Sequence, residues 1–160
     1  MDSATARLAA LRVEDIMVQP VVTVRVNSTM SAAAAVFVEH QISGAPVVDD
    51  LGQCVGFLSA SHFVKSRAEE MDGSKLVSHY LRANHPSGLY SINELRCDLV
   101  QNHMSSACQS VGRGVPLLQA AKTMCQERVH RLLVIDTNGA PVGILTSIDL
   151  VATITFLAED

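Results

Sequence analysis

The sequence lacks tryptophan, and aromatic residues make up only 4% of its 160 residues. Basic residues are also few, since 12 Lys and Arg stand against 16 Asp and Glu and leave a net charge of −4. Proteins that bind DNA or RNA use basic surfaces together with aromatic side chains that stack on bases. This composition therefore predicts no nucleic-acid partner.

Long apolar runs and paired cysteines are missing as well. No apolar run is long enough to span a membrane, and residues 1–12 are typical of an amphipathic helix and not of a signal peptide. The 4 cysteines show no Cys-x-x-Cys spacing, which favours thiols kept in a reducing compartment. We therefore predict a cytoplasmic protein that does not enter a membrane.

Common catalytic motifs are absent too. The chain has no Gly-x-Ser-x-Gly elbow, no Gly-x-x-x-x-Gly-Lys phosphate loop and no His-Glu-x-x-His pair. Five other residues could be imagined as metal ligands, but their spacings fit no standard zinc pattern: His79, His85, Cys97, His103 and Cys108. We expect no enzyme activity, no bound metal and no required cofactor.

The dominant feature that is present is an internal repeat. Sliding the sequence by 87 places lays residues 13–64 over residues 100–151 without a gap. The overlay brings Met17 onto Met104, Ala33-Ala34 onto Ala120-Ala121 and Val55-Gly56 onto Val142-Gly143. Two copies of so long a unit predict two similar halves related by a pseudo-twofold axis, and not an open solenoid.

The first copy predicts a short strand, a helix, two strands and a second helix. An extended run at 22–24 precedes Ser28, a plausible N-cap for a helix whose apolar residues recur with helical spacing from Met30 to Val38. Two apolar runs, at 45–49 and 55–58, then flank a turn. The second helix is expected to begin near Ala60.

The second copy predicts the same order of elements. Pro116 suits a first helical position, and runs at 132–136 and 142–145 flank Asn138-Gly139, a strong hairpin signal. The last helix should begin near Ser147 and is apolar on more than one face. The fold class predicted is α/β (α+β), with two β-α-β-β-α repeats packed about a pseudo-twofold axis. The expected parts are an N-terminal helix (1–12), repeat 1 (13–65), a connecting insertion (66–98) with a possible helix at 75–83, and repeat 2 (99–160).

This order of elements and three stretches, 42–49, 129–136 and 143–149, resemble a tandem pair of cystathionine-β-synthase (CBS) domains, or Bateman module. The resemblance covers about 13–64 and 100–151. It implies that an adenosyl ligand (AMP, ADP, ATP or S-adenosylmethionine) binds in a cleft between the repeats. It also implies a regulatory protein that pairs into a homodimer.

The chemistry is predicted at the start of the last helix. Asp149 lies in its first turn, where a carboxylate can accept both hydrogen bonds of a vicinal diol such as ribose. Thr146 precedes the helix, whose free N–H groups favour a phosphate beside the threonine hydroxyl. The alternative interpretation is that Asp149 only complements the helix dipole.

Other ligand contacts are implied by the resemblance alone. His130 and Arg131 match a basic pair that contacts phosphates, and guanidinium donors suit phosphate oxygens; a solvated loop pair is the alternative. An adenine slot would be lined by Met17, Val22 and Ile42. Ser43 would reach a phosphate, and Ile144 would form part of the pocket floor. The alternative is that these are plain core residues.

The first copy departs from this pattern. It keeps a hydroxyl at Ser59 but has His62 where the second copy has Asp149. A neutral imidazole has one acceptor nitrogen and cannot take two hydroxyl hydrogen bonds. We therefore predict one competent ribose site and a second, weaker cleft at Ser59 and His62. His62 itself is either a pH-sensitive element or an ordinary surface histidine.

The main hypothesis is a ligand-sensing regulatory module that acts on a protein partner of unknown identity. The alternative is a ligand-free dimerisation scaffold. A homodimer is expected in both cases, because four apolar residues near the chain ends need cover: Leu8, Leu11, Ile154 and Leu157.

Overall fold

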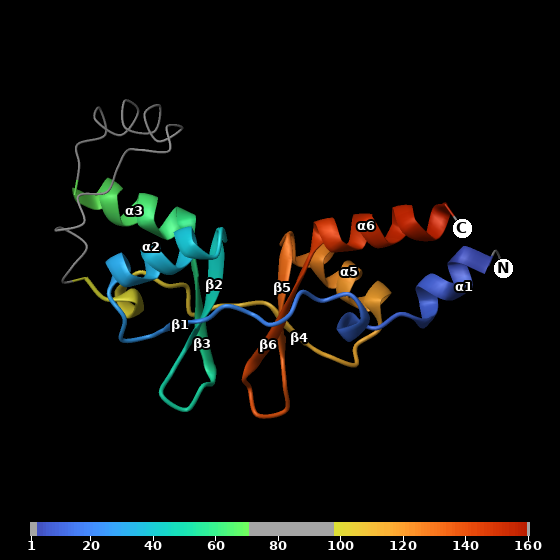
Figure 1. Cartoon of the computed structure of the whole chain (residues 1–160), viewed down its shortest axis with the longest axis horizontal. Coiled ribbons are helices and arrows are strands. Elements are labelled where there is room, and N and C mark those ends of the chain that lie inside the picture. The colour runs from blue at the N-terminus through green and yellow to red at the C-terminus, as the bar shows by residue number, and fades with distance from the viewer. Residues whose placement is uncertain (1–2, 71–97, 160) are drawn as a thin grey trace. The chain divides into compact units, whose positions relative to one another are not determined.

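The computed structural model describes residues 3–70 and 98–159, arranged as two compact units (Figure 1). Unit 1 comprises residues 1–23, 50–54 and 107–160, and unit 2 comprises 24–49 and 55–106. Each unit contains a three-stranded sheet with helices, as the predicted fold class requires. The possible helix at 75–83 lies outside the described residues. Among those residues, no helix has both the length and the apolar character needed to cross a membrane.

Unit 2 is built on a sheet in the order β1-β2-β3. Strand β1 pairs in parallel with β2, with Val24 opposite Val47. The elements of this sheet and its helices are β1 (Val24–Arg25), α2 (Met30–Glu39), β2 (Gly44–Val48), β3 (Cys54–Ser59), α3 (Ala60–Glu70) and the 3-10 helix η2 (Val100–Asn102). Its core includes Met30, Leu58 and Val100, all with no exposed surface.

Unit 1 repeats this plan with the order β4-β5-β6, in which β4 is parallel to β5 and β5 is antiparallel to β6. The N-terminal helix packs against both long helices of the unit. Its elements are α1 (Ser3–Ala10), the 3-10 helix η1 (Val13–Asp15), β4 (Ser110–Gly112), α5 (Leu117–Glu127), β5 (Arg131–Ile135), β6 (Pro141–Thr146) and α6 (Ser147–Ala158). Leu117, Leu132 and Leu145 form the centre of its core.

Two predicted helix starts are shifted by one position. The N-cap of α2 is Thr29 and not Ser28, because the Thr29 hydroxyl accepts the Ala32 N–H at 3.1 Å. Pro116, predicted at the first helical position of α5, is its N-cap. Thr29 and Pro116 are equivalent in the repeat, so both copies begin this helix at the same place.

Each unit includes the opening segment of the other repeat. In unit 1, Val18 from the first copy bridges Ile144 of β6, and Met17 lies so close to Gly143 that an added Cβ would stand 2.6 Å from its sulfur. In unit 2, the equivalent Ser105 bridges Phe57 of β3. The opening segment of the first repeat therefore belongs to unit 1, and that of the second repeat belongs to unit 2, so the repeats exchange these segments.

Candidate functional site

The start of α6 is closed by a reciprocal cap between Thr146 and Asp149. The Thr146 N–H donates to Asp149 Oδ2 at 2.7 Å, and the Thr146 hydroxyl donates to the same oxygen at 2.6 Å. In return, the Asp149 N–H points at Thr146 Oγ1 at 3.4 Å. This arrangement is a capping box, which satisfies helix N–H groups that have no partner within the helix.

The cap determines what remains for a ligand. Asp149 Oδ2 accepts two hydrogen bonds, whereas Oδ1 has no hydrogen-bond partner among the described residues. The Thr146 hydroxyl proton is used within the cap, so this hydroxyl cannot donate to a phosphate while the cap is intact. Asp149 thus holds the N-cap of α6 with Oδ2, and its Oδ1 stays without a hydrogen-bond partner among the described residues.

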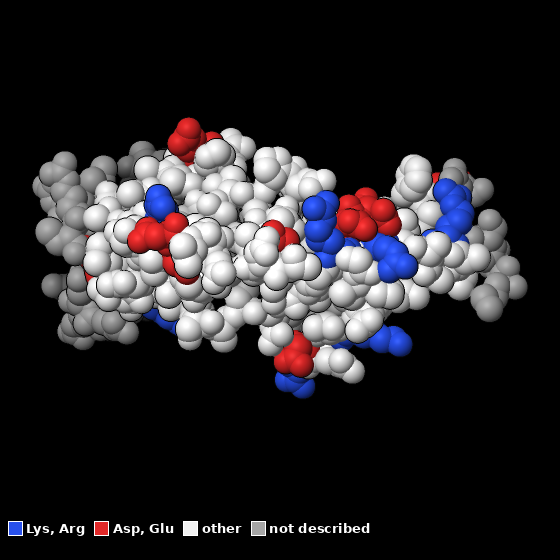
Figure 2. All heavy atoms as spheres, turned by 90° about the horizontal axis from the view of Figure 1, so that it is seen from below, with Lys and Arg blue, Asp and Glu red and all other residues white. Residues whose placement is uncertain are grey.

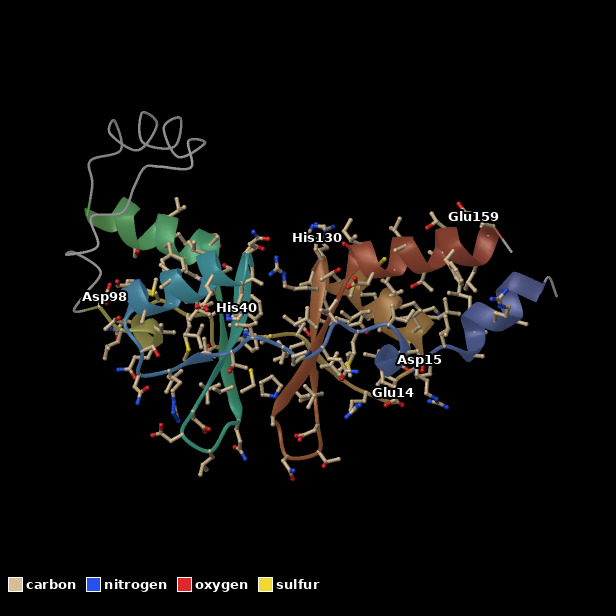
Figure 3. The ribbon with its side chains drawn as sticks, viewed as in Figure 1. Glu14, Asp15, His40, Asp98, His130 and Glu159 are labelled. Atoms are coloured by element: carbon tan, nitrogen blue, oxygen red, sulfur yellow. The ribbon has the colours of Figure 1, made fainter. Side chains whose placement is uncertain are left out.

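The basic pair lies next to this cap. Arg131 is directly opposite Thr146 in the β5–β6 register, and the Ser147 N–H donates to the His130 carbonyl at 3.0 Å. His130 is exposed where β5 begins, beside the start of α6 (Figure 3). The hairpin therefore brings together the four polar residues predicted in the second copy.

The predicted apolar contacts of unit 1 lie in different surroundings. Met17 is 6% exposed and belongs to the core, while Ile144 is half-buried where it bridges Val18. Val22 is half-buried and lies two residues before β1 begins at Val24.

The junction of unit 2 has the same construction with a different closing residue. The Ser59 N–H donates to His62 Nδ1 at 3.0 Å, and Ser59 Oγ lies 3.2 Å from the same nitrogen. The Ala60 N–H donates to the Ser43 carbonyl at 2.9 Å, which matches the bond between Ser147 and His130. Ser43 is exposed beside this junction, and Ile42 packs against the core of unit 2.

The surroundings of His62 disfavour its charged form. Its pKa is lowered from the usual value, first by burial and then by the positive charges of Lys65 and His103. His103 lies against the Asp98 carboxylate. His62 is therefore held as a neutral imidazole that accepts a hydrogen bond at Nδ1.

A groove of about 620 Å³ lies between α1 and α6 in unit 1. Of the predicted ligand residues, only Asp149 borders it. The others that line it are mostly apolar, with Arg7, Asp15 and Thr153 as polar members: Arg7, Ala10, Leu11, Asp15, Ile16, Ala152, Thr153, Phe156 and Leu157. The sequence gives no signal for Arg7 and Asp15 as site residues, because their position depends on how α1 packs against α6.

Metal-ligating side chains do not gather in the part of the chain that the structure describes. No group of three or more His, Cys, Asp and Glu there could hold an ion. Burial, with a smaller contribution from Cys54, raises the pKa of the Cys108 thiol to about 11. Cys108 is therefore a protonated, unreactive thiol at neutral pH. Of the five residues considered as ligands, His79, His85 and Cys97 lie outside the described residues.

Charged groups are sparse and mixed on the face drawn in Figure 2. Basic and acidic side chains occur there in small neighbouring groups separated by uncharged surface. Among the described residues, Arg113 and Glu14 form an ion pair, with 3.5 Å between Nε and Oε2. This face carries no basic stripe of the kind that follows a phosphate backbone.

Comparison with known families identifies the fold class. The CBS domain family matches residues 13–69 and 98–155, which together make up most of the chain. The chain therefore belongs to the CBS domain family and contains a tandem pair of these domains.

Curated relatives are moderately similar. The uncharacterized protein MJ1232 of Methanocaldococcus jannaschii is 28% identical over 144 residues, which cover 90% of this chain and 40% of that protein. The uncharacterized protein MJ1426 of the same organism is 28% identical over 156 residues, covering 87% of this chain and 88% of its own length. The chain thus spans less than half of the first relative and most of the second.

Solved structures share the fold. The CBS domain of a CBS domain-containing membrane protein from Sphaerobacter thermophilus is 28% identical with a TM-score of 0.73, covering 94% of this chain and 92% of that one. CBSX2 in complex with AMP is 23% identical with a TM-score of 0.70, covering 93% and 99%. The CBS domain pair of MJ0100, in complex with 5′-methylthioadenosine and S-adenosyl-L-methionine, is 21% identical with a TM-score of 0.68, covering 94% and 98%.

Proposed function

We propose that this chain is a regulatory module that binds an adenosyl ligand, such as AMP, ADP, ATP or S-adenosylmethionine, at the start of α6. Asp149 Oδ1 would accept hydrogen bonds from the ribose hydroxyls. Arg131 and His130 would lie near the charged tail of the ligand. The observation that carries this proposal is the carboxylate of Asp149, which has one oxygen fixed by the cap and the other without a partner among the described residues.

Two considerations support an adenosyl ligand over other small molecules. A carboxylate oxygen with two open lone pairs suits a vicinal diol, and a charged acceptor strengthens each hydrogen bond. CBSX2 and the MJ0100 domain pair are similar in fold and are in complex with AMP and with S-adenosyl-L-methionine, respectively. The role proposed is binding and not catalysis, because the residues at the cap are all used to hold one another or a ligand.

The test is calorimetric titration of the four adenosyl ligands into the wild-type protein and Asp149→Asn. The asparagine side chain keeps a carbonyl oxygen for the cap but replaces the open oxygen with an NH₂ donor. Loss of a charged hydrogen bond of about 1.5–3 kcal/mol should weaken binding roughly 10- to 100-fold. Glu127→Gln, which removes an exposed charge from α5 in the same unit, should bind like the wild type.

Each other outcome has a definite meaning. A bound ligand at 100 times its dissociation constant should also stabilise the fold by about 2.7 kcal/mol. If none of the four ligands gives a heat of binding or stabilises the fold, the dimerisation scaffold is the function that is left. Equal affinity in Asp149→Asn and wild type would remove Asp149 from the site.

The second site, at Ser59 and His62, is proposed to be weak or unable to bind ribose. The one acceptor nitrogen of the neutral imidazole already takes the Ser59 N–H. His62→Asp restores the carboxylate of the other copy and should raise the binding stoichiometry from about one adenosyl ligand per chain to about two. An unchanged stoichiometry would show that more than this residue disables the second site.

A homodimer is proposed to form through α6. Ile148, Val151 and Ile154 lie on one face of this helix and are 72%, 56% and 53% exposed. Leu8, Leu11 and Leu157 find cover within unit 1, so they do not require a partner. A second copy is the occupant proposed because a twofold axis would set this apolar face against itself.

Ile154→Arg tests the dimer and mimics Arg67, its counterpart in the first copy. Sedimentation equilibrium should show the mass fall from two chains to one. Val38→Arg places the same charge on an apolar residue of α2 that is 78% exposed, and should leave the mass unchanged. A wild-type protein that sediments as a monomer would overturn the proposal.

A further inference from the structure

The capping residue of α3 is an imidazole, and imidazoles change charge within the physiological pH range. His62 Nδ1 accepts the Ser59 N–H at 3.0 Å. An acceptor nitrogen carries no proton, so the proton of the neutral ring is on Nε2. Ser59 Oγ lies 3.2 Å from Nδ1 and 2.7 Å from Ser61 Oγ, which gives the serine hydroxyl a partner on either side.

We propose that His62 is a proton-sensitive cap, which closes the start of α3 when the ring is neutral and releases it when the ring is protonated. Protonation at Nδ1 turns the acceptor into a donor and sets it against the Ser59 N–H. The Ser59 N–H, at the junction of β3 and α3, then loses its acceptor.

The groups around His62 oppose its protonation. Lys65 is on the same helix, one turn further on, and His103 follows η2 from the other side. The Asp98 carboxylate lies against His103, and no carboxylate is among the groups that shift the pKa of His62. Burial acts in the same direction as the two cations.

The direction of the effect follows from linkage. The pKa of His62 is lowered in the folded protein, so the unfolded chain binds a proton more readily. The contribution of the cap is complete above pH 6.5, the ordinary value for histidine, and is lost as the pH falls through the lowered value. Unit 1 has an aspartate and not an imidazole at the equivalent place.

The first measurement is on the unaltered protein. Long-range proton–nitrogen NMR distinguishes the two neutral tautomers of histidine. At pH 7.5, His62 should carry its proton on Nε2 and show Nδ1 as a hydrogen-bonded acceptor. A proton on Nδ1 at that pH would overturn the proposal, whatever any variant does.

The second measurement compares unfolding equilibria at pH 7.5 and 5.5 in the absence of ligand. His62→Asn keeps a side-chain acceptor that does not titrate, so the wild-type folding constant should fall about fivefold more than the variant's, the size of a lost cap. His40→Asn removes an exposed histidine that follows α2 in the same unit (Figure 3), and should keep the wild-type pH dependence. Equal pH dependence in His62→Asn and wild type would contradict the proposal. Neither measurement involves a nucleotide, so the outcome is independent of the proposed function.

Discussion

The two helix starts of this protein are built on one backbone plan but are closed by different chemistry. In unit 1, Asp149 receives the N-cap N–H and leaves a second acceptor oxygen open. In unit 2, His62 receives the equivalent N–H and is left with a donor. The duplicated scaffold thus tolerates either residue as a cap, whereas only the carboxylate also keeps an acceptor oxygen that the cap does not use. Structural and ligand-binding demands on one position can therefore be separated by comparing the copies.

The largest expected effect on stability comes from placing a side chain at Gly56 or Gly143, the strand glycines that the exchanged opening segments cover. A Cβ at Gly56 would lie 2.6 Å from the Ser105 carbonyl oxygen, whereas one at Gly143 would lie 2.6 Å from the Met17 sulfur. The backbone oxygen cannot move alone, but a methionine side chain can adopt another rotamer. We expect Gly56→Ala to destabilise the protein by about 3 kcal/mol or more and Gly143→Ala by about 1–2 kcal/mol.

Urea denaturation of both alanine variants measures this difference. Gly114→Ala is the control, because a Cβ there meets nothing within 4 Å. A Gly143→Ala variant as unstable as Gly56→Ala would show that Met17 is held as rigidly as the backbone.

A smaller effect is expected at the N-cap of α6. Thr146→Ala removes the hydroxyl that pairs with Asp149 and should cost about 1 kcal/mol of unfolding free energy. Thr146→Ser keeps the hydroxyl and should recover most of that loss. Thermal and urea unfolding of both variants check the expectation, and equal stability of the alanine and serine variants would show that the hydroxyl contributes nothing.

The smallest effect concerns the residues that end the first helix of each copy. Gln41 and Arg128 are equivalent, and both adopt left-handed backbone conformations, with φ of 52° and 53°. Glycine adopts this conformation without a Cβ clash, so Arg128→Gly should stabilise unit 1 by about 0.5–1 kcal/mol. Gln41→Gly should do the same for unit 2. A loss of stability at both positions would mean that their side chains matter more than the backbone.

Local features of the site could be predicted from the sequence. The places of Thr146 and Asp149 follow from where the last helix begins, and their separation of three residues is that of a capping box. The Asn138-Gly139 turn predicts that β5 and β6 pair as a hairpin, whereas the pairing of Arg131 with Thr146 also depends on the register shift between Val134 and Ile135. These inferences need only neighbouring residues and the geometry of one hairpin.

Long-range features could not be predicted in the same way. An offset between two copies shows that Met17 and Met104 are equivalent, but not which sheet each one covers. The groove beside Asp149 depends on the packing of α1 against α6, which no local pattern specifies. The use of one Asp149 oxygen by the cap depends on a rotamer and not on residue type.

The reciprocal exchange of opening segments bears on how such a duplicated protein could arise. A chain holding a single repeat would carry an opening segment that fits another molecule's sheet, and its own sheet would be covered only after it exchanged that segment with a second copy. Fusing two such chains turns the exchange into an intramolecular closure, whose effective concentration depends on the length of the connection, here residues 66–98. Within one chain the two equivalent positions can differ, as the aspartate and the histidine of the two helix starts do, whereas identical subunits would carry the same residue at both.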